Sequence, residues 1–247
     1  MSTIPNAIVI GAGKAGTTSL YKYLDAHPEI FGSRIKELMY FSSKFGRGVE
    51  WYLSNFPRQE GVKVYFEATP QYSLREKFGN VPERIYDFNP DMSILYIVRE
   101  PLSRIVSHYN HWSRRHPGRF TDIEASLQRP GQRKMFVDRT RYHYQIQHYL
   151  NIFPAEQVKV VFLEDLKSDF VPSLNEVFRF LGVEQCAETI ENRVFNRRPR
   201  NKNAHVWKLE DISQESQKEI VETLSEDVQK LLSLCGKPAD FRGEAYL

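Results

Sequence analysis

The sequence predicts an α/β fold in which a doubly wound parallel sheet is flanked by helices. Continuous apolar runs at Ile94–Val98 and Val158–Leu163 lack the alternation of a half-exposed strand, which is typical of strands buried on both faces. Amphipathic segments follow these runs, and strands that alternate with helices indicate βαβ units. A third run, ending at Ile10, passes through three glycines into a helical segment, as in P-loop-like folds.

Length and composition favour one domain. A chain of 247 residues can bury a sizeable core, and no linker divides it, so a single domain over residues 1–247 is expected. The net charge of +3 is small for this length, and charges of both signs are mixed along the chain, which argues against a dedicated nucleic-acid binder. Cys186 and Cys235 lack metal-ligand spacing, so neither a zinc site nor a disulfide framework is expected.

The chain also lacks the features of secreted and membrane-spanning proteins. Its N-terminus has no succession of basic, apolar and small residues, and no apolar run approaches the roughly 18 residues that cross a bilayer. A cytoplasmic protein without a membrane span is therefore expected. The oligomeric state is not readable from the sequence.

The turn after the first strand is an expected anion site. Backbone N–H groups in a glycine-rich turn point inward, and the N-terminus of the following helix carries about half a positive charge. Lys14 adds a full charge, and Thr17 and Thr18 add hydroxyl donors. The residues expected to hold a phosphate or sulfate are Gly13, Lys14, Ala15, Gly16, Thr17, Thr18 and Ser19.

The lysine of this turn is in the wrong register for ATP. In the Walker A pattern the lysine follows the last glycine, whereas Lys14 lies two residues before Gly16. An ordinary kinase or ATPase loop is disfavoured, and a tight turn with an incidental lysine is the alternative. After the helix Thr17–Ala26, the segment Ile35–Phe41 carries Glu37, a candidate general base because of its closeness in sequence to the anion loop. The alternative is an exposed charge on a short helix.

The middle of the chain continues the alternation of helices and strands. A helix is expected in Gly48–Pro57, with Trp51, Tyr52 and Phe56 in the core. A strand at Val62–Ala68 and a helix from Pro82 to Phe88 follow. The strand Ile94–Val98 then leads into Arg99 and a helix that begins near Pro101 and carries Ser107. An arginine at the carboxyl end of a parallel strand faces the ligand crevice of such sheets; the alternative is an ion pair with Glu100 or Asp91.

The second half combines two irregular segments with regular elements. Residues 114–139 are polar and contain Pro-Gly pairs, so they are expected to form an irregular lid or an acceptor-binding insertion. His108, His111 and His116 are too loosely spaced for a metal helix and are taken as structural or acceptor-facing. Residues 192–202 form a dense basic loop. Helices are expected at Arg139–Phe153, at Val171–Leu181 and from about Ser213 to Cys235.

Two separate cationic sites point to a ligand with two anionic ends. ATP needs one phosphate cradle and a magnesium ligand, commonly a strand-end aspartate, and no such aspartate stands out in this sequence. A nucleotide with a 5′-phosphosulfate and a separate 3′-phosphate needs two cradles. That nucleotide is 3′-phosphoadenosine 5′-phosphosulfate (PAPS), and its product is 3′,5′-adenosine bisphosphate (PAP).

With these motifs in order, the chain resembles the PAPS-dependent sulfotransferases, and in particular the branch of the heparan sulfate N- and 3-O-sulfotransferases. The matching motifs are Gly-Ala-Gly-Lys-Ala-Gly-Thr-Thr at 11–18, Lys-Glu-Leu-Met-Tyr-Phe at 36–41, Phe-Glu-Ala-Thr-Pro-x-Tyr at 66–72 and Val-Arg-Glu-Pro-x-x-Arg-x-x-Ser at 98–107. The resemblance implies that residues 11–18 hold the 5′-phosphosulfate, that Arg99 and Ser107 hold the 3′-phosphate and that Glu37 is the catalytic base. It also implies a basic loop over the nucleotide, for which Arg197, Arg198, Arg200 and Lys202 are the candidates.

Two positions depart from this branch on the acceptor side. Ala68 stands where the heparan sulfate enzymes have a lysine, and Met39 stands where they have a histidine, so a heparan-like acceptor does not follow from the resemblance. The residues expected to contact the acceptor are Met39, Phe41, Gln71, Tyr72, His111 and Tyr142.

The sequence therefore predicts transfer of a sulfuryl group from PAPS to a hydroxyl, or as a second choice an amine, of a carbohydrate or a small hydroxylated metabolite. Glu37 and Lys14 are the expected catalytic residues, and no metal is expected to be required. Two alternatives stay open at this point: a P-loop kinase that uses ATP and magnesium, and a non-catalytic module that binds an anionic ligand.

Overall fold

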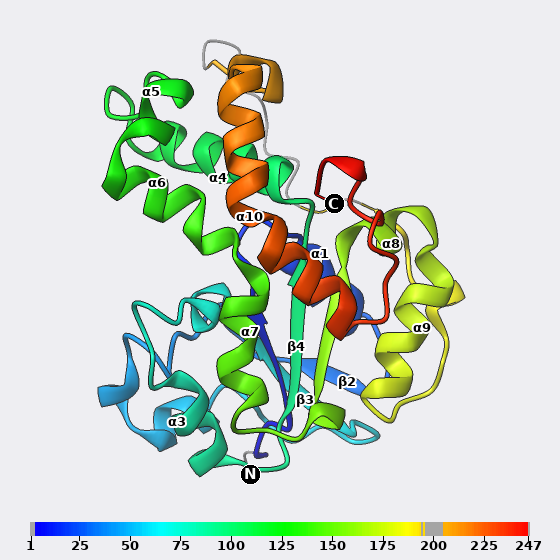
Figure 1. Cartoon of the computed structure of the whole chain (residues 1–247). Coiled ribbons are helices and arrows are strands. Elements are labelled where there is room, and N and C mark those ends of the chain that lie inside the picture. The colour runs from blue at the N-terminus through cyan, green and yellow to red at the C-terminus, as the bar shows by residue number, and fades with distance from the viewer. Residues whose placement is uncertain (1–2, 194, 196–204, 247) are drawn as a thin grey trace. The chain divides into compact units, whose positions relative to one another are not determined.

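The computed structural model describes residues 3–193, 195 and 205–246 (Figure 1). By its internal contacts the chain divides into two compact units. The first comprises Met1–Val98 and Ile146–Arg197, and the second comprises Arg99–Gln145 and Arg198–Leu247. The organisation of residues 1–247 as one domain stays a prediction.

The first unit contains a five-stranded parallel sheet, which confirms the expected α/β fold. The strands lie in the order β2-β3-β1-β4-β5, and every neighbouring pair is parallel. In the register of the sheet, Val9 of the central strand pairs with Ala68 on one side and with Leu95 on the other. The strands are β1 (Ala7–Gly11), β2 (Ile30–Gly32), β3 (Val64–Ala68), β4 (Ser93–Val98) and β5 (Val158–Phe162).

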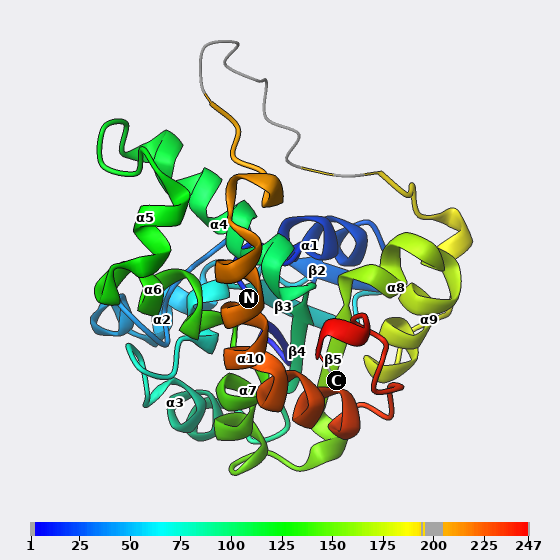
Figure 2. The ribbon, with the colours of Figure 1, turned by 45° about the horizontal axis from the view of Figure 1, so that its top comes forward.

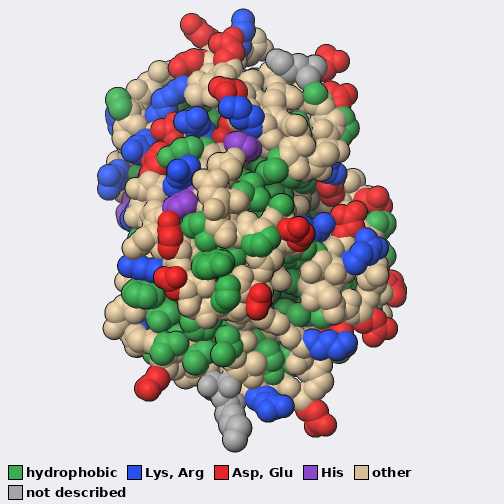
Figure 3. Space-filling model, turned by 60° about the horizontal axis from the view of Figure 1, so that its bottom comes forward, with side chains coloured by type: hydrophobic (Ala, Val, Ile, Leu, Met, Phe, Trp, Pro, Cys, Tyr) green, Lys and Arg blue, Asp and Glu red, His purple; other side chains and the backbone are tan. Residues whose placement is uncertain are grey.

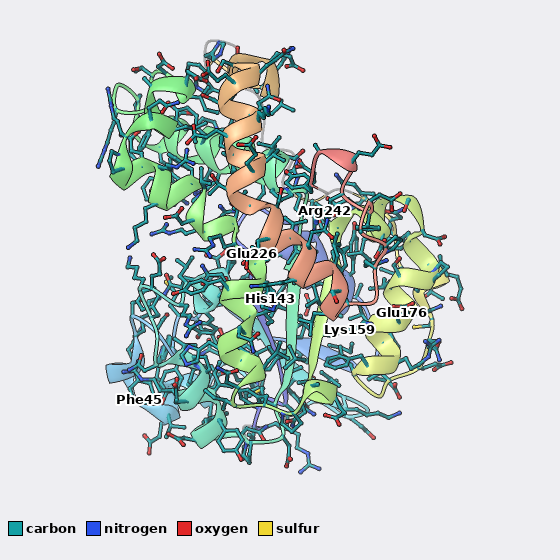
Figure 4. All side chains as sticks on the ribbon, in the orientation of Figure 1. Phe45, His143, Lys159, Glu176, Glu226 and Arg242 are labelled. Carbon is teal, nitrogen blue, oxygen red and sulfur yellow. The ribbon has the colours of Figure 1, made fainter. Side chains whose placement is uncertain are left out.

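Helices bury the apolar strands, as the absence of alternation predicts. Every residue of β1 and β3 is buried, and one side of the sheet packs against α1 (Thr17–Asp25) and α9 (Phe170–Phe180) in the main hydrophobic core. Figures 1 and 2 both show α8 (Leu163–Ser168) and α9 next to β5. Lys159 of β5 and Glu176 of α9 point toward each other in Figure 4, with Nζ and Oε2 3.3 Å apart.

The order of the strands determines where a ligand is expected to bind. From β1 the chain builds β2 and β3 on one side of the central strand and then β4 and β5 on the other. In sheets of this kind, ligands bind beyond the carboxyl ends of the strands, where the strand order reverses. The glycine-rich turn after β1 lies at this reversal point.

The first unit contains two elements that the sequence-based expectation did not include. The short strand β2 was not expected, because three residues after His27-Pro28 give no periodic signal. The helix α8 was likewise not among the expected helices. The helices expected near residues 48–57 and 82–88 are observed as α2 (Val49–Leu53) and α3 (Val81–Phe88).

The described part of the second unit is helical. It comprises α4 (Pro101–Arg115), α5 (Ile123–Gln128), α6 (Pro130–Phe136), the beginning of α7 (Tyr142–Leu150) and α10 (Gln214–Leu234). Figure 2 shows α5 and α6 side by side. Within this unit, the Asp227 carboxylate of α10 accepts hydrogen bonds from the backbone N–H groups of His143 (3.0 Å) and Tyr144 (2.9 Å), which caps the first turn of α7.

The expectation that residues 114–139 are irregular is wrong. Asp122 caps α5 by accepting a hydrogen bond from the Ala125 N–H at 3.0 Å, and Pro130 occupies the first position of α6. Proline is favoured there because its missing N–H has no intrahelical partner to lose. The Pro-Gly pair at 130–131 therefore begins a helix and does not mark a turn. The signal that would have indicated α5 was Asp122 directly before Ile123, with Leu127 four residues further on.

Charged side chains of both signs are distributed over the surface. On the face drawn in Figure 3, acidic and basic side chains are interspersed among hydrophobic and polar ones. This mixture agrees with the small net charge of +3.

Candidate active site

The turn between β1 and α1 requires glycine where the sequence has it. Gly16 has a φ of 102°, and a Cβ atom added there would lie 2.9 Å from Leu163 Cδ1 and 3.3 Å from Ile97 Cδ1. A Cβ on Gly11 would lie 2.3 Å from Ser73 Oγ. The turn therefore packs its backbone directly against β4, α8 and the segment that follows β3.

The same turn presents backbone donors at the start of α1. The Leu20 N–H donates to Gly16 O at 3.0 Å, so the N–H groups of Thr17, Thr18 and Ser19 precede this first helical hydrogen bond. Gly16 is the N-cap and has no side chain to accept from them. The Ala12 N–H donates to Ile97 O of β4 at 2.7 Å, which fixes the beginning of the turn. These donors and Lys14 lie in the turn where the sequence predicts an anion site.

Backbone conformations that are rare outside glycine occur at the two predicted catalytic residues. Among the described residues, Lys14 (φ 72°), Glu37 (φ 64°) and Met39 (φ 57°) are the non-glycine residues with positive φ. Such conformations cost free energy and persist where the surrounding structure imposes them, which is frequently at functional sites. Glu37 is exposed in a segment without helical structure, so the alternative of a charge on a short helix is not what the structure shows. Its carboxylate lies 2.8 Å from Lys36 Nζ.

Hydrogen bonds from the end of β3 hold the Glu37 segment at every second residue. The Glu37 N–H donates to Ala68 O (3.2 Å), the Met39 N–H donates to Thr69 Oγ1 (3.2 Å) and the Phe41 N–H donates to the Tyr72 hydroxyl (3.1 Å). The Lys14 turn follows β1, and the Glu37 segment follows β2 and is held against the end of β3, the parallel neighbour of β1, so both lie at the same edge of the sheet. The structure thus brings the two predicted catalytic residues to one side of the first unit.

A buried carboxyl group lies behind this segment, and the sequence analysis did not single it out. Glu67 of β3 is 0% exposed. Its Oε2 accepts a hydrogen bond from the Thr69 hydroxyl at 2.8 Å, and its Oε1 accepts one from the Tyr72 hydroxyl at 2.9 Å. Burial raises the pKa of Glu67 to about 7. A charged residue inside the strand expected at Val62–Ala68 was the available signal.

The predicted acceptor contacts of the first unit divide into two pairs. Phe41 and Tyr72 are 0% and 1% exposed, and the Phe41 ring packs against Tyr72 and Phe88 at centroid distances of 5.9 and 5.5 Å. Met39 and Gln71 are half-buried, and the Gln71 side-chain amide donates to Ser42 Oγ at 2.5 Å. The contacts of all four residues with an acceptor stay predictions, with Met39 and Gln71 nearer the surface.

The second unit holds the residues expected to bind the 3′-phosphate. Arg99 directly follows β4, and Ser107 lies half-exposed about two turns into α4. The Glu100 carboxylate accepts from the N–H groups of Leu102 (2.9 Å) and Ser103 (2.6 Å), so it caps α4. Glu100 is thus engaged with its helix, which weakens the alternative of an ion pair with Arg99 and leaves the phosphate role of Arg99 as a prediction.

The other predicted residues of this unit are more enclosed. Tyr142 is 0% exposed, and the Arg242 guanidinium lies over its ring at 5.8 Å. His111 is half-buried next to Trp112, with ring centroids 6.4 Å apart. The Trp112 indole donates to His108 Nε2 at 3.0 Å, which supports a structural role for that histidine. Arg197, Arg198, Arg200 and Lys202 lie outside the described residues.

Comparison with known proteins gives the same family from the sequence and from the fold. The sulfotransferase domain model matches residues 5–238. Human heparan sulfate glucosamine 3-O-sulfotransferase 5 is 32% identical over 190 residues, which are 73% of this chain and 54% of that protein. The crystal structure of a sulfotransferase from Alicyclobacillus acidocaldarius superposes with a TM-score of 0.74 at 26% identity and covers 96% of this chain and 97% of that one. The chain thus spans about half the length of the curated relatives, at 54% for the human enzyme.

The relatives contradict the expected cytoplasmic location. The membrane-associated sulfotransferase kil1 of Dictyostelium discoideum is 36% identical over 110 residues, which are 43% of this chain and 23% of kil1. The expectation rested on the start of the chain and on its lack of a span, features that carry little weight in a chain matching only part of its relatives. Among the described residues, no helix combines the length and the apolar character needed to cross a membrane.

The family match also decides among the alternatives left open by the loop. The register of Lys14 argues against ATP, the five parallel strands place its turn at the reversal of the strand order, and the family model covers nearly the whole chain. Neither a kinase nor an incidental turn accounts for all three of these observations. The resemblance inferred from the motifs is therefore confirmed, and the chain belongs to the sulfotransferase family.

Proposed function

We propose that this protein transfers the sulfuryl group of PAPS to a hydroxyl group of a carbohydrate. The observation that carries the proposal is that Lys14 follows β1 while Glu37 is hydrogen-bonded to the end of the neighbouring strand β3, each residue in a left-handed backbone conformation. Lys14 supplies a cation at the proposed anion site, and Glu37 supplies an exposed carboxylate at the same edge of the sheet. A relative named for 3-O-sulfation of heparan sulfate glucosamine supports a sugar hydroxyl as the acceptor.

The nucleotide is held by its two anionic ends. The N–H groups of the turn and the hydroxyls of Thr17 and Thr18 bind the 5′-phosphate, because helix N-termini and inward-pointing amides favour anions. Arg99 and Ser107 bind the 3′-phosphate. Lys14 stabilises the negative charge that develops on the oxygen between phosphorus and sulfur as that bond breaks.

The transfer is an in-line displacement at sulfur. The acceptor oxygen forms a bond to sulfur while the bond from sulfur to the phosphate oxygen breaks, and PAP leaves with that electron pair. Glu37 takes the proton of the acceptor hydroxyl, so the products are a sulfate ester, PAP and a protonated Glu37. Positioning and fixed charges supply the catalysis, as in phosphoryl transfer. A sulfonate carries less charge than a terminal phosphate, so Lys14 is proposed to suffice without a metal.

The donor is tested first by binding. The midpoint of thermal unfolding is measured with PAP and with ATP plus magnesium, each at increasing concentrations. A ligand that binds only the folded state raises the midpoint. We expect PAP to raise it and ATP with magnesium to have a much smaller effect. A shift with ATP and magnesium alone would contradict the proposed donor.

The reaction is tested by following labelled sulfate from PAPS into a panel of acceptors. The panel contains N-sulfated and desulfated heparan, a neutral oligosaccharide and small phenols and alcohols. Label is expected in a carbohydrate. Transfer to the small hydroxylated compounds alone would replace the acceptor class, and binding of PAP without transfer to any of them would support the non-catalytic module.

A further inference from the structure

The segment that carries Glu37 owes its conformation to hydrogen bonds that converge on one buried side chain. Thr69 and Tyr72 accept the backbone N–H groups of Met39 and Phe41, and the hydroxyls of both donate to the carboxyl of Glu67. Two hydrogen bonds therefore link Glu67 to the backbone N–H of Met39 and two link it to that of Phe41. It does not reach the surface, since its exposed fraction is 0%.

The direction of these hydrogen bonds is fixed along both paths. A hydroxyl has one proton to donate and accepts with its lone pairs. Thr69 and Tyr72 give their protons to Glu67, so each presents only lone pairs toward the N–H of the Glu37 segment. A carboxylate, which accepts at both oxygens, is the group that imposes this direction on two hydroxyls at once.

We propose that Glu67 is a positioning residue that, through Thr69 and Tyr72, holds the backbone in the conformation that presents Glu37 to the acceptor. This inference rests on the proposed role of Glu37 as the base. It assigns to Glu67 no contact with either substrate.

The two left-handed residues explain why such an anchor is needed. Glu37 and Met39 have φ values of 64° and 57°, a conformation that a free segment rarely adopts. The Glu37 N–H donates to the backbone O of Ala68, the residue after Glu67. The hydroxyls of Thr69 and Tyr72, which relay the effect of Glu67, accept the N–H groups of Met39 and Phe41. If the Thr69 and Tyr72 hydroxyls did not hold Met39 and Phe41, only the hydrogen bond from the Glu37 N–H to Ala68 O would remain of the three. The carboxylate of Glu37 would then lose its fixed position, and misplacement by about 1 Å can cost about a hundredfold in rate.

The anchor depends on the ionisation of Glu67. A protonated carboxyl must itself donate one proton, so one of the two hydroxyls can no longer donate to it and that relay loses its direction. The titratable groups that face Glu67 are Tyr52 of α2, Tyr72 and Tyr149 of α7, and burial keeps the pKa of each tyrosine well above 10, so all three are neutral. The Tyr52 hydroxyl is buried and lies close enough to the Glu67 carboxyl to lower its pKa. The anchor is intact above about pH 7 and weakens below it.

The test compares E67Q with the wild type and with two relay variants. Glutamine keeps the size of the side chain but accepts at one oxygen only and does not titrate. E67Q is expected to lower kcat about ten- to a hundredfold, with PAP affinity unchanged, and to remove the loss of kcat that the wild type shows as pH falls through 7. T69V and Y72F are expected to lower kcat as well, whereas T69S, which keeps the hydroxyl, restores it.

A second readout does not depend on turnover. Hydrogen exchange of the Met39 and Phe41 amides is measured by mass spectrometry in the wild type, E67Q and T69V. Both variants are expected to exchange faster at Met39, and E67Q also at Phe41. Unchanged exchange and an unchanged pH profile in E67Q would overturn the proposal, and so would full activity of T69V and Y72F. If E67Q does not fold, T69V and Y72F decide the matter by the same two measurements.

The outcome is distinguishable from failure of the proposed function. An active E37Q variant would remove Glu37 from the role of base and so remove the proposed function itself. An inactive E37Q variant together with an E67Q variant that behaves as the wild type would remove only the positioning role.

Discussion

At the scale of single residues, several energetic costs fall on or next to the candidate site. Lys14, Glu37 and Met39 hold left-handed backbone conformations, which cost on the order of 1 kcal/mol or more each. Glu67 adds a buried carboxyl group whose ionisation is opposed by desolvation. Each cost falls on a residue of the candidate site or on one that holds it. That distribution is expected where function, and not stability, has selected the residue.

The buried carboxyl makes a prediction about stability and pH. The folded pKa of Glu67, about 7, lies above its ordinary value of 4.5, so between these values the folded chain binds a proton that the unfolded chain does not. The contribution of this group is fully present below pH 4.5 and is lost as pH rises through 7, by about 3 kcal/mol at 1.36 kcal/mol per pKa unit. Urea unfolding at pH 5, 6, 7 and 8 is expected to show this loss in the wild type but not in E67Q.

The matched control for this comparison is E50Q. Glu50 lies on α2 in the same unit and is exposed, so its replacement is expected to leave the pH dependence of stability unchanged. Parallel curves for the wild type and E67Q from pH 5 to pH 8 would show that Glu67 does not titrate in this range.

At the scale of elements, the turn from β1 into α1 is determined by glycine. Gly16 combines a φ of 102° with a packing distance of 2.9 Å from a potential Cβ to Leu163, whereas Gly182 has a φ of 69° and no atom near its potential Cβ. Gly182→Ala is thus a control for conformation alone, with an expected loss of about 1 kcal/mol in the free energy of unfolding. Gly16→Ala is expected to lose more, and it also weakens PAP binding. Equal losses, measured by urea unfolding, would show that packing at Gly16 is unimportant.

The start of α7 depends on a carboxylate from another helix. Asp227 accepts the N–H groups of His143 and Tyr144, so Asp227→Ala is expected to cost about 1 kcal/mol in the free energy of unfolding, as the loss of a helix cap does. Glu226→Ala changes the neighbouring exposed residue, which pairs with Lys230, and is expected to leave stability nearly unchanged. Figure 4 labels His143 and Glu226 on their helices. Similar effects of the two substitutions would contradict the capping role.

Elements with a clear pattern in neighbouring residues could be predicted from the sequence, and elements without one could not. The strands β1, β4 and β5 follow from unbroken apolar runs, and the turn after β1 follows from its glycines and Lys14. The short strand β2 gives no periodic signal, and α5 and α6 were obscured by polar residues and Pro-Gly pairs. The importance of Glu67 depends on Thr69, Tyr72 and a loop some 30 residues earlier, and such a pairing is visible only after folding.

At the scale of the whole molecule, membership of the sulfotransferase family rests on the agreement of motif order, strand order and the match over residues 5–238. Family membership does not identify the acceptor, because two positions on the acceptor side, Ala68 and Met39, differ from the heparan sulfate enzymes. Different residues are expected to contact the acceptor and the nucleotide, so a substitution on the acceptor side can leave the nucleotide site unchanged. Met39→His is accordingly expected to change the KM for a carbohydrate acceptor severalfold and to leave the KM for PAPS unaltered, in assays with labelled donor. An equal change in both values would contradict this separation.

The central claim is that Glu37 is the base and Lys14 the electrostatic partner of the leaving group. The most direct measurement is kcat for sulfuryl transfer from labelled PAPS by Glu37→Gln and Lys14→Ala, with PAP affinity determined for each variant. We expect kcat to fall about a hundredfold or more in both, since a base or an electrostatic donor typically contributes that much. PAP is expected to bind Glu37→Gln as it binds the wild type. Turnover of Glu37→Gln at the wild-type rate would contradict the account.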